Sequence, residues 1–342
     1  MTSAVNQVSL VLRRAWTRRE IRRRLAPALK GCGLAPNVEH RLLTLDSEAL
    51  VVALEGAPRP LVVKIATSPA ASAGLDRHAH LLAWLRPALG DRSAARLPQV
   101  MRRGRYQGER VLVETRLPGT ATAEPAAEPG LDPRLTSAAL AAITEIHRST
   151  GAPTILDRAV LQDWVDEPLG YLRRLPAWAG TPAALDRLAA TLHESLTGQR
   201  VTAAAVHGDF RSGNVLVRTT EVGPEVTGIV DWGNALRVGL PDTDLVHWWL
   251  AGRPIELGAA VRQTLDSPGW ADAQLEALPV TRPNPQVPVE DAVLLTWLGH
   301  VRAGLARATR NPLSPIWVAR NIRAVLQYFA VPTGSRRIAR AA

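Results

Sequence analysis

The stretch AVHGDFRSGNVLV, residues 205–217, places a histidine, an aspartate and an asparagine in one short segment just before a predicted strand. Besides His207 it holds Asp209 and Asn214, residue types that orient a hydroxyl group or hold a metal ion. The segment between them, Phe-Arg-Ser-Gly, is too irregular to form one face of a helix. The stretch therefore predicts a polar loop, either in an active site or in a simple turn.

A predicted hairpin follows this loop. Residues 215–230, VLVRTTEVGPEVTGIV, read as two strands with Gly223 and Pro224 at the turn, and Asp231 comes directly afterwards. Because a hairpin brings its two ends together, we expect Asn214 and Asp231 to lie close in space. One carboxylate and one amide oxygen suit Mg²⁺, which keeps several waters and shares its remaining positions with phosphates. The alternative is a set of Asx turns at strand ends.

A lysine stands out against the arginine bias of the chain. Of the 41 lysines and arginines only two are lysines, and one of them, Lys64, lies in a predicted strand. Strands are predicted over residues 39–45, 49–56 and 60–66, and a buried lysine in the last is costly unless it meets an anion. Alternatively its stem snorkels to water from a strand edge. A metal site, a nearby base at Asp209 and a lysine for phosphates are the parts of phosphoryl transfer.

The coarse order of elements predicts two unequal lobes and an α+β fold. The strand-rich first third continues with a helix over residues 71–89 and a strand over 110–115. From residue 134 onward the pattern is helical, apart from the hairpin. We therefore expect domains over 1–115 and 116–342 with a ligand cleft between them.

Composition restricts the class of protein. The chain is 46% hydrophobic and 21% charged, which predicts a globular fold, and no apolar run is long enough to span a membrane. Cys32 is the only cysteine, and the N-terminal apolar stretch precedes its charges, unlike a secretory signal, so we expect a cytoplasmic protein. The net charge of +10 is spread along the chain. Its densest part, residues 13–30, predicts a basic helix that is solvated or binds an acidic partner; no motif indicates nucleic acid.

The pattern HGDFRSGN…IVDWGNALRVGLPDTDL resembles the aminoglycoside phosphotransferase family of small-molecule kinases, within the protein-kinase-like superfamily. Further upstream, LVVKIA resembles the family's strand with the nucleotide lysine, VLVETRLPG its hinge, and LAAITEIHR a helix that ends in Ile-His-Arg. The resemblance implies a bilobal protein-kinase-like fold, with a small N-lobe built on an antiparallel sheet and a larger, mostly helical C-lobe. It also implies transfer of a phosphoryl group from ATP or GTP to a small-molecule hydroxyl, and it permits antibiotic resistance as the role.

The resemblance also assigns roles to the catalytic segment. It implies that Asp209 is the catalytic base or orients the acceptor hydroxyl, and that Asn214 and Asp231 hold Mg²⁺. His207 is expected to tie the loop to the strand that carries Asp231. To these we add Arg211, because a cation beside the base stabilises the transferred phosphoryl group; the alternative is a surface arginine.

Outside that segment the resemblance assigns Lys64 to the α- and β-phosphates of the nucleotide. It makes Glu114, Thr115 and Arg116 the hinge whose backbone meets the purine. Asp244 is expected to hold the catalytic loop from within the protein, or alternatively to cap a helix.

Two features depart from the family pattern. The segment LTLDSEALVV, residues 43–52, has no glycine, and Ser47 is the candidate to contact the phosphates in its place. The glutamate that normally pairs with the lysine is replaced by His78, and neither neighbour, Asp76 or His80, is a good substitute. Lys64 is therefore expected to pair differently, with Asp231 or only once nucleotide binds.

The acceptor region is more basic than acidic. From residue 251 onward we count eleven arginines against six aspartates and glutamates. This balance disfavours a polycationic acceptor and favours a neutral or anionic hydroxyl compound, such as a sugar, a nucleoside or a carboxylated natural product. Residues 266–288 are loop-rich and are expected to form a rim over it.

Two rival functions stay open at this point. The missing glycine and glutamate fit a catalytically impaired pseudokinase that only binds nucleotide or another ligand. A protein kinase is disfavoured because no Ala-Pro-Glu segment and no long activation loop follow Asp231.

Overall fold

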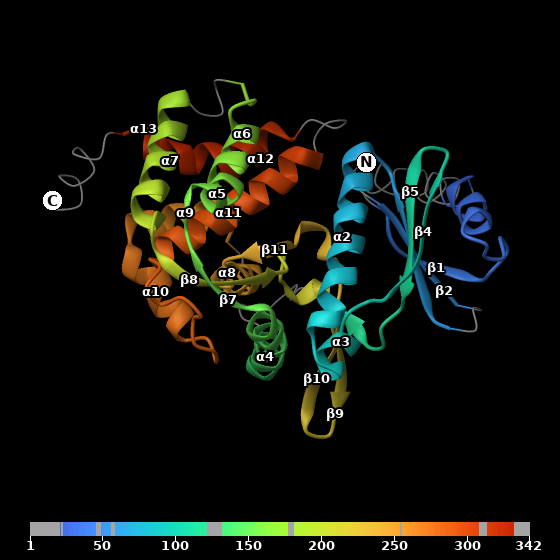
Figure 1. Ribbon diagram of the computed structural model, residues 1–342. Helices are drawn as coiled ribbons and strands as arrows, with labels where there is room; N and C mark the ends of the chain where they lie inside the picture. The colour runs from blue at the N-terminus through green and yellow to red at the C-terminus, as the bar shows by residue number, and fades with distance from the viewer. Residues whose placement is uncertain are drawn as a thin grey trace, which may run out of the picture. The chain divides into compact units, whose positions relative to one another are not determined.

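A computed structural model describes most of the chain (Figure 1). It describes residues 21, 23–45, 49–55, 59–121, 132–176, 181–253, 255–307 and 313–331. Ser47 therefore lies outside the described residues, as does the start of the predicted basic helix. The chain divides into two compact units, one of residues up to Ala83 with Pro98–Leu117, the other of Trp84–Leu97 with all residues from Pro118 onward. None of the helices within the described ranges is long and apolar enough to cross a membrane.

The first unit is built on a five-stranded antiparallel sheet in the order β1-β2-β3-β5-β4. Its strands are β1 His40–Leu45, β2 Ala49–Leu54, β3 Leu61–Ala66, β4 Val100–Tyr106 and β5 Glu109–Thr115. Val63 and Val113 point to the face that packs on the helical residues 23–31. Since side chains alternate along a strand, Lys64 points to the opposite face, next to helix α2, Pro69–Ala88.

The four strands and the helix predicted for this region are confirmed, and the structure adds β4. Its sequence, VMRRGRY, carries three arginines, and most of its side chains are exposed because β4 is an edge strand. Charged edge strands lack the alternation of apolar residues that reveals a strand in a sequence.

The second unit is mostly helical, and α11 lies at its centre, in contact with α6, α8, α9 and α10. Nearly every side chain of its first three turns is buried, as expected of a helix enclosed on all sides. The helices are α3 Asp91–Ala95, α4 Pro133–Thr150, α5 Arg158–Leu161, α6 Glu167–Leu172, α7 Pro182–Leu196, α8 Asp242–Ala251, α9 Leu257–Asp266, α10 Pro268–Glu276, α11 Val289–Arg307, α12 Pro315–Val318 and α13 Ala324–Ala330, with π-helical turns at Gln162–Asp166 and Ala319–Arg323.

This unit also contains a small sheet that the sequence did not predict, so the expectation that only the hairpin interrupts the helices is wrong. The antiparallel strands β7 Ala152–Ile155, β8 Arg200–Val206 and β11 Leu236–Gly239 lie in the order β11-β8-β7. β8 reads RVTAAAV, and alanine has little preference for strands, so its pattern is weak. β8 is nevertheless the strand that delivers the chain to His207.

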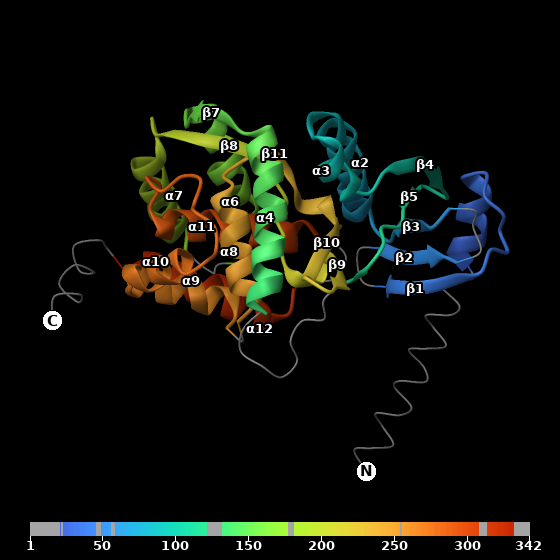
Figure 2. The ribbon, with the colours of Figure 1, turned by 90° about the horizontal axis from the view of Figure 1, so that it is seen from below.

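The predicted hairpin is confirmed as β9 Val215–Thr220 and β10 Gly223–Ile229, with the short strand β6 Thr120–Ala121 beside β9. The turn lies two residues earlier than expected, at residues 221–222, because Gly223 pairs with Thr220 and Pro224 with Thr219. β10 is an edge strand, where a proline without an N–H is tolerated. Within the second unit the hairpin extends away from α7 and α13 (Figures 1 and 2).

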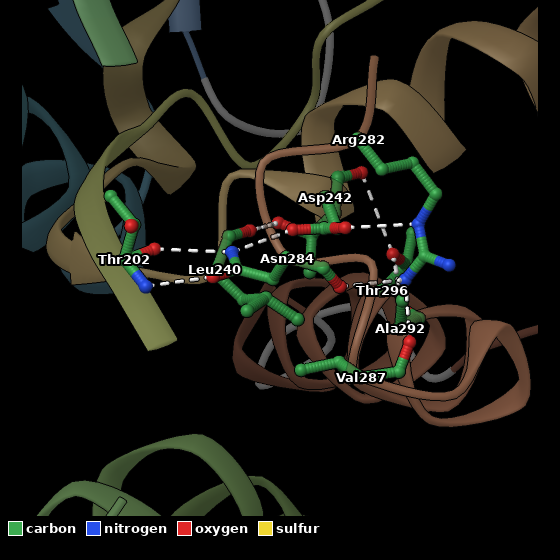
Figure 3. Close-up of polar contacts among 9 residues, drawn as sticks. Thr202, Leu240, Asp242, Arg282, Asn284, Val287, Ala292 and Thr296 are labelled. Carbon is green, nitrogen blue, oxygen red and sulfur yellow. Dashed lines mark hydrogen bonds and ion pairs between the residues drawn. The ribbon is translucent and has the colours of Figure 1, made fainter. Parts of the chain in front are cut away.

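In the segment over residues 266–288, α10 occupies the first half, and polar contacts hold Asn284 of the loop-rich second half (Figure 3). The rim over the acceptor stays a prediction. Asn284 is fully buried; its Oδ1 accepts from the backbone N–H of Thr202 at 2.7 Å, and its Nδ2 donates to Asp242 Oδ2 at 2.8 Å. Arg282 Nε donates to Asp242 Oδ1 at 3.0 Å. These bonds join the segment to β8 and to the start of α8.

Asp291, in the first turn of α11, is expected to make stability depend on pH. Burial raises the pKa of its carboxyl to about 6, although Ser195 donates a hydrogen bond to it. A raised folded-state pKa means that stability is present at low pH and is lost as pH rises, here by about 3 kcal/mol between about pH 4 and pH 6. Between about pH 4 and pH 6 the free energy of unfolding of wild type, measured in urea, should therefore fall by about 3 kcal/mol relative to that of Asp291→Asn. The same pH dependence of this free energy in both proteins would contradict the prediction.

Candidate active site

The loop after β8 is held by one buried carboxylate. Asp244, in the first turn of α8, accepts hydrogen bonds from the backbone N–H groups of His207 at 2.8 Å and Gly208 at 2.9 Å. His147 Nε2, in the last turn of α4, donates to the same carboxylate at 2.9 Å. The expectation that Asp244 holds the loop is therefore confirmed. The alternative, that Asp244 caps a helix, is wrong, because the N-cap residue of α8 is Pro241 and Asp244 makes no capping hydrogen bond.

The charge of Asp244 is favoured despite its complete burial. Burial raises the pKa of the carboxyl, but the hydrogen bond and charge of His147, together with His207, outweigh burial and lower that pKa below its usual value. A carboxylate with three N–H donors is thus preorganised to fix the backbone of the loop.

Two residues of the loop, Gly208 and His207, let the loop lie close to the segment that follows the hairpin. Gly208 has φ of +74°, and a Cβ there would lie 2.5 Å from the carbonyl oxygen of Asn234, so only glycine fits. His207 Nε2 donates to the carbonyl oxygen of Val230 at 2.9 Å, while its Nδ1 accepts from the N–H of Asp209. His207 therefore ties the loop to the segment that carries Asp231, as expected.

Asp209 and Asn214 are brought into direct contact. A 3-10 turn, Ser212–Asn214, follows the loop and leads into β9. Asn214 Nδ2 donates to the backbone oxygen of Asp209 at 2.8 Å and to its Oδ2 at 3.3 Å. This use of Nδ2 assigns the side-chain oxygen of Asn214 as the atom that is left to face a cation.

Asp231 follows β10 and is one of two non-glycine residues with positive φ in the described parts of the chain. Its φ of 67° and ψ of 58° are left-handed, which is uncommon outside glycine and tends to mark functional positions. The N–H of Val230 donates to the backbone oxygen of Asn214 at 2.9 Å. The hairpin thus brings the chain next to Asp231 and Asn214 together, as the sequence predicted.

This donor set fits Mg²⁺ in its chemistry. Asp209, Asn214 and Asp231 offer only oxygen ligands toward a cation, and Mg²⁺ takes one or two carboxylates while its other positions go to water and phosphate. The described residues contain no cluster of three or more histidines, cysteines or carboxylates of the kind that holds a metal by protein ligands alone. A magnesium ion here would therefore depend on phosphate oxygens as well.

Aromatic side chains support the loop from behind. The rings of His207 and Trp232 lie 4.6 Å apart between centroids, and those of Phe210 and Trp248 lie 5.2 Å apart. Phe210 and Trp232 are completely buried, and Trp232 Nε1 donates to the carbonyl oxygen of Ile229. Among the polar side chains of the loop, His207, Ser212 and Asn214 are also buried, whereas Asp209 and Arg211 remain partly exposed.

Arg211 contacts the candidate base directly. Its Nε lies 3.5 Å from Asp209 Oδ2, and its side chain is 39% exposed. The guanidinium is therefore beside the carboxylate and open to solvent, a position compatible with the predicted role and with a surface ion pair.

A small cavity of about 60 Å³ lies in the second unit beside the loop. Gly208 and Asn234 line it on the loop side, and its charged residues are Asp163 and Arg302. Burial lowers the pKa of His247, another wall residue, although the Asp209 carboxylate acts in the opposite direction. Asp163, His247 and Arg302 come from elements far apart in the chain, so no local motif could place them in one cavity.

In the first unit, Lys64 is paired with a carboxylate that sequence reasoning missed. Lys64 Nζ lies 2.9 Å from Glu114 Oε1, and His78 Nε2 lies 2.8 Å from Glu114 Oε2. Burial would raise the pKa of Glu114, but Lys64 and His78 together lower it to about 2. Glu114 was predicted only as a hinge residue, and the structure adds this side-chain role.

The other predicted hinge residues make backbone contacts within the first unit. The N–H of Thr115 donates to the carbonyl oxygen of Gln99, and that of Arg116 donates to Pro60, each at 2.9 Å. Neither amide hydrogen is left for a purine, so a base contact from these residues would use their carbonyl oxygens. The guanidinium of Arg116 pairs with Glu55 at 3.2 Å.

Comparisons with known proteins agree with this arrangement. The model of the phosphotransferase enzyme family, APH, matches residues 39–278, well over half of the chain. Aminoglycoside 2′-phosphotransferase-IIIa, solved with GDP, has a TM-score of 0.52 at 16% identity, covering 88% of this chain and 93% of that one. A thermostable variant of aminoglycoside phosphotransferase APH(4)-Ia, solved with AMP-PNP and hygromycin B, has a TM-score of 0.52 at 14% identity, covering 89% and 96%.

These likenesses show the bilobal, protein-kinase-like α+β fold. No curated protein sequence matches the chain significantly. The family match covers the Lys64 strand, the loop over residues 207–214 and the hairpin alike. The chain therefore belongs to the phosphotransferase enzyme family and is a phosphotransferase that acts on the hydroxyl group of a small molecule.

Proposed function

We propose that the enzyme transfers the γ-phosphoryl group of ATP, or of GTP, to a hydroxyl of a neutral or anionic small molecule, with Mg²⁺. The contact of Asp209 with Asn214, 2.8 Å and 3.3 Å, in a loop held by Asp244, carries this proposal. Gly208 of the same loop lines the cavity of the second unit, so an acceptor in that cavity would lie next to the loop that carries Asp209.

Asp209 would accept the proton of the acceptor hydroxyl as its oxygen attacks the γ-phosphorus, and the bond from that phosphorus to the β,γ-bridging oxygen breaks. Asn214 and Asp231 would hold Mg²⁺, which neutralises charge on the phosphates. Asp244 and Gly208 keep Asp209 in place, because they fix the backbone on its N-terminal side.

Lys64 would bind the α- and β-phosphates as a compact positive charge. ATP and GTP both remain candidates, since one similar structure holds AMP-PNP and the other holds GDP. The roles of Ser47 at the phosphates and of residues 114–116 at the base remain predictions of the family pattern.

The acceptor is proposed to be neutral or anionic because the cavity does not gather carboxylates. Its wall contains one acidic residue, Asp163, and one arginine, Arg302. A polycation would need several carboxylates to replace its hydration. Antibiotic resistance would require an antibiotic that fits this charge pattern.

The rival function, a pseudokinase, loses one of its two arguments. It was motivated in part by the absence of a glutamate partner for Lys64 on the early helix, and Glu114 supplies such a carboxylate from β5. The remaining argument is the missing glycine near Ser47.

A phosphorylation screen tests the proposed function. Sugars, nucleosides, carboxylated natural products and antibiotics are incubated with ATP or GTP and Mg²⁺, and an added phosphoryl group is detected by mass. We expect turnover of at least one acceptor, which is lost without Mg²⁺. Nucleotide binding without turnover of any acceptor would support the pseudokinase.

Arg211 is expected to assist the transfer. Arg211→Ala should lower kcat by about tenfold to a hundredfold, because charge on the moving phosphoryl group loses a nearby cation. Arg211→Lys should recover part of this loss. An unchanged kcat in Arg211→Ala, measured with saturating acceptor and nucleotide, would make Arg211 a surface arginine only.

A further inference from the structure

We propose that Glu114 and His78 are positioning residues for the nucleotide lysine: Glu114 fixes the Lys64 ammonium, and His78 fixes the Glu114 carboxylate. This inference rests on the proposed function of Lys64 in binding nucleotide phosphates. The partner of the lysine, Glu114, is thus on strand β5, and His78 on helix α2 holds Glu114 in place.

The sheet geometry brings Lys64 and Glu114 together. β3 and β5 are antiparallel neighbours in which Lys64 pairs with Leu112 and Val62 with Glu114. Lys64 and Glu114 are thus diagonal partners on the same face, within reach of long side chains. Because both strands belong to one hydrogen-bonded ladder, the ion pair does not depend on the position of a separate element.

Each oxygen of the Glu114 carboxylate has its own partner. Oε1 pairs with Lys64 Nζ at 2.9 Å and Oε2 with His78 Nε2 at 2.8 Å. The exposed fractions of the three side chains are only 10% for Lys64, 3% for Glu114 and 1% for His78. A carboxylate oxygen accepts, so Nε2 must carry the proton, and in this dry setting the loss of either partner leaves a buried charge poorly satisfied.

The two neighbours of His78 that the sequence offered do not take this role. Asp76 pairs with Arg110 at 2.6 Å, and His80 is exposed. Arg110 is on β5 as well, so the Asp76 pair links the same helix and strand without involving Lys64. Asp76 is therefore a matched control, because it forms a partly exposed ion pair between α2 and β5 that should not affect the lysine.

The arrangement predicts how the lysine behaves toward phosphate. An ammonium has three donors, so pairing with one carboxylate oxygen is compatible with binding phosphate oxygens. With Glu114 and His78 in place, the ammonium is held before nucleotide arrives and little side-chain entropy is lost on binding. Without them, the loss appears in nucleotide affinity rather than in the chemical step.

The test compares nucleotide KM, kcat and the nucleotide-induced rise in Tm for six variants. Glu114→Gln should raise the ATP KM by about tenfold to a hundredfold, since a hydrogen-bonded charge at Lys64 is lost. His78→Leu should raise it by about fivefold or more, and His78→Gln, whose amide can still donate to Glu114, should restore it to within about threefold. Asp76→Asn should stay within about twofold of wild type, and kcat should change less than KM throughout.

The combined variant shows whether His78 acts through Glu114. If it does, adding His78→Leu to Glu114→Gln should raise KM no further, so the two effects are not additive. Full additivity would overturn the proposal, as would His78→Gln being no better than His78→Leu. If Glu114→Gln does not fold, the comparison of the two His78 variants, which retain Glu114, still decides.

Lys64→Met separates this inference from the proposed function. Loss of nucleotide binding in Lys64→Met, with wild-type KM in Glu114→Gln and His78→Leu, would overturn the inference and leave the function intact. Normal nucleotide binding in Lys64→Met would overturn the proposed function of the lysine itself.

Discussion

Replacing Asp209 by asparagine should lower kcat by about a thousandfold, the size of effect typical of a general base in proton transfer. The substitution keeps the shape of the side chain, and the bond from Asn214 Nδ2 to the backbone oxygen at residue 209 is unaffected. The amide oxygen can still accept from Asn214, but an amide cannot take a proton from a hydroxyl. Turnover by the purified variant, measured with the acceptor found in the screen, checks this result.

The expected signature is a loss in kcat with nucleotide binding preserved. The nucleotide-induced rise in Tm should match that of wild type, because Lys64 and its partners are unchanged. A variant that keeps more than a tenth of the wild-type kcat would show that Asp209 only orients the acceptor. A variant with lower Tm in the absence of nucleotide would point to a structural role.

The proximity of Asp209, Asn214 and the chain next to Asp231 could be predicted from the sequence because this geometry is local. Asp209 and Asn214 are five residues apart, and the hairpin that follows returns the chain beside them at Asp231. The glycine at 208 is required because Asn234 approaches it closely. The sequence shows the glycine, but it does not show the contact that requires it.

Contacts between distant parts of the chain could not be predicted. Glu114 was placed in the hinge because its neighbours resemble one, and nothing in the sequence says that β5 lies beside β3. Asn284 looked like part of a loop rim, yet it is buried between Thr202 and Asp242. In each case the polar side chain is satisfied by a residue that only the tertiary fold brings near.

Asp244→Asn should lower the free energy of unfolding by about 3 kcal/mol at pH 7, because a buried carboxylate with three N–H donors loses its charge. The amide offers only one acceptor oxygen, so its NH₂ group would face the backbone N–H of His207 or of Gly208. The loop would lose part of its support, and kcat should fall along with stability. Urea unfolding and turnover of the same preparation measure both effects.

Asp242→Asn is the matched control. Asp242 is also buried and lies two residues from Asp244, but its pKa is shifted in the opposite direction. Burial raises the pKa of Asp242 despite its bonds to Asn284 and Arg282, so a neutral amide replaces it at a smaller cost of about 1 kcal/mol. Its effect on kcat should also be smaller, because it does not contact the loop residues that Asp244 binds.

Each substitution lowers the free energy of unfolding relative to wild type, and we call this loss its deficit. The deficits of Asp244→Asn and Asp242→Asn should change with pH in opposite directions. The folded-state pKa of Asp244 lies below its unfolded value, so its carboxylate stabilises the fold above about pH 4 and this stability is lost as pH falls. The deficit of Asp244→Asn relative to wild type therefore shrinks on acidification. The folded-state pKa of Asp242 is raised, so wild type gains stability on acidification and the deficit of Asp242→Asn grows. Equal deficits for the two variants, or the same pH trend in both, would contradict the assignment of Asp244 as the charged residue that holds the catalytic loop.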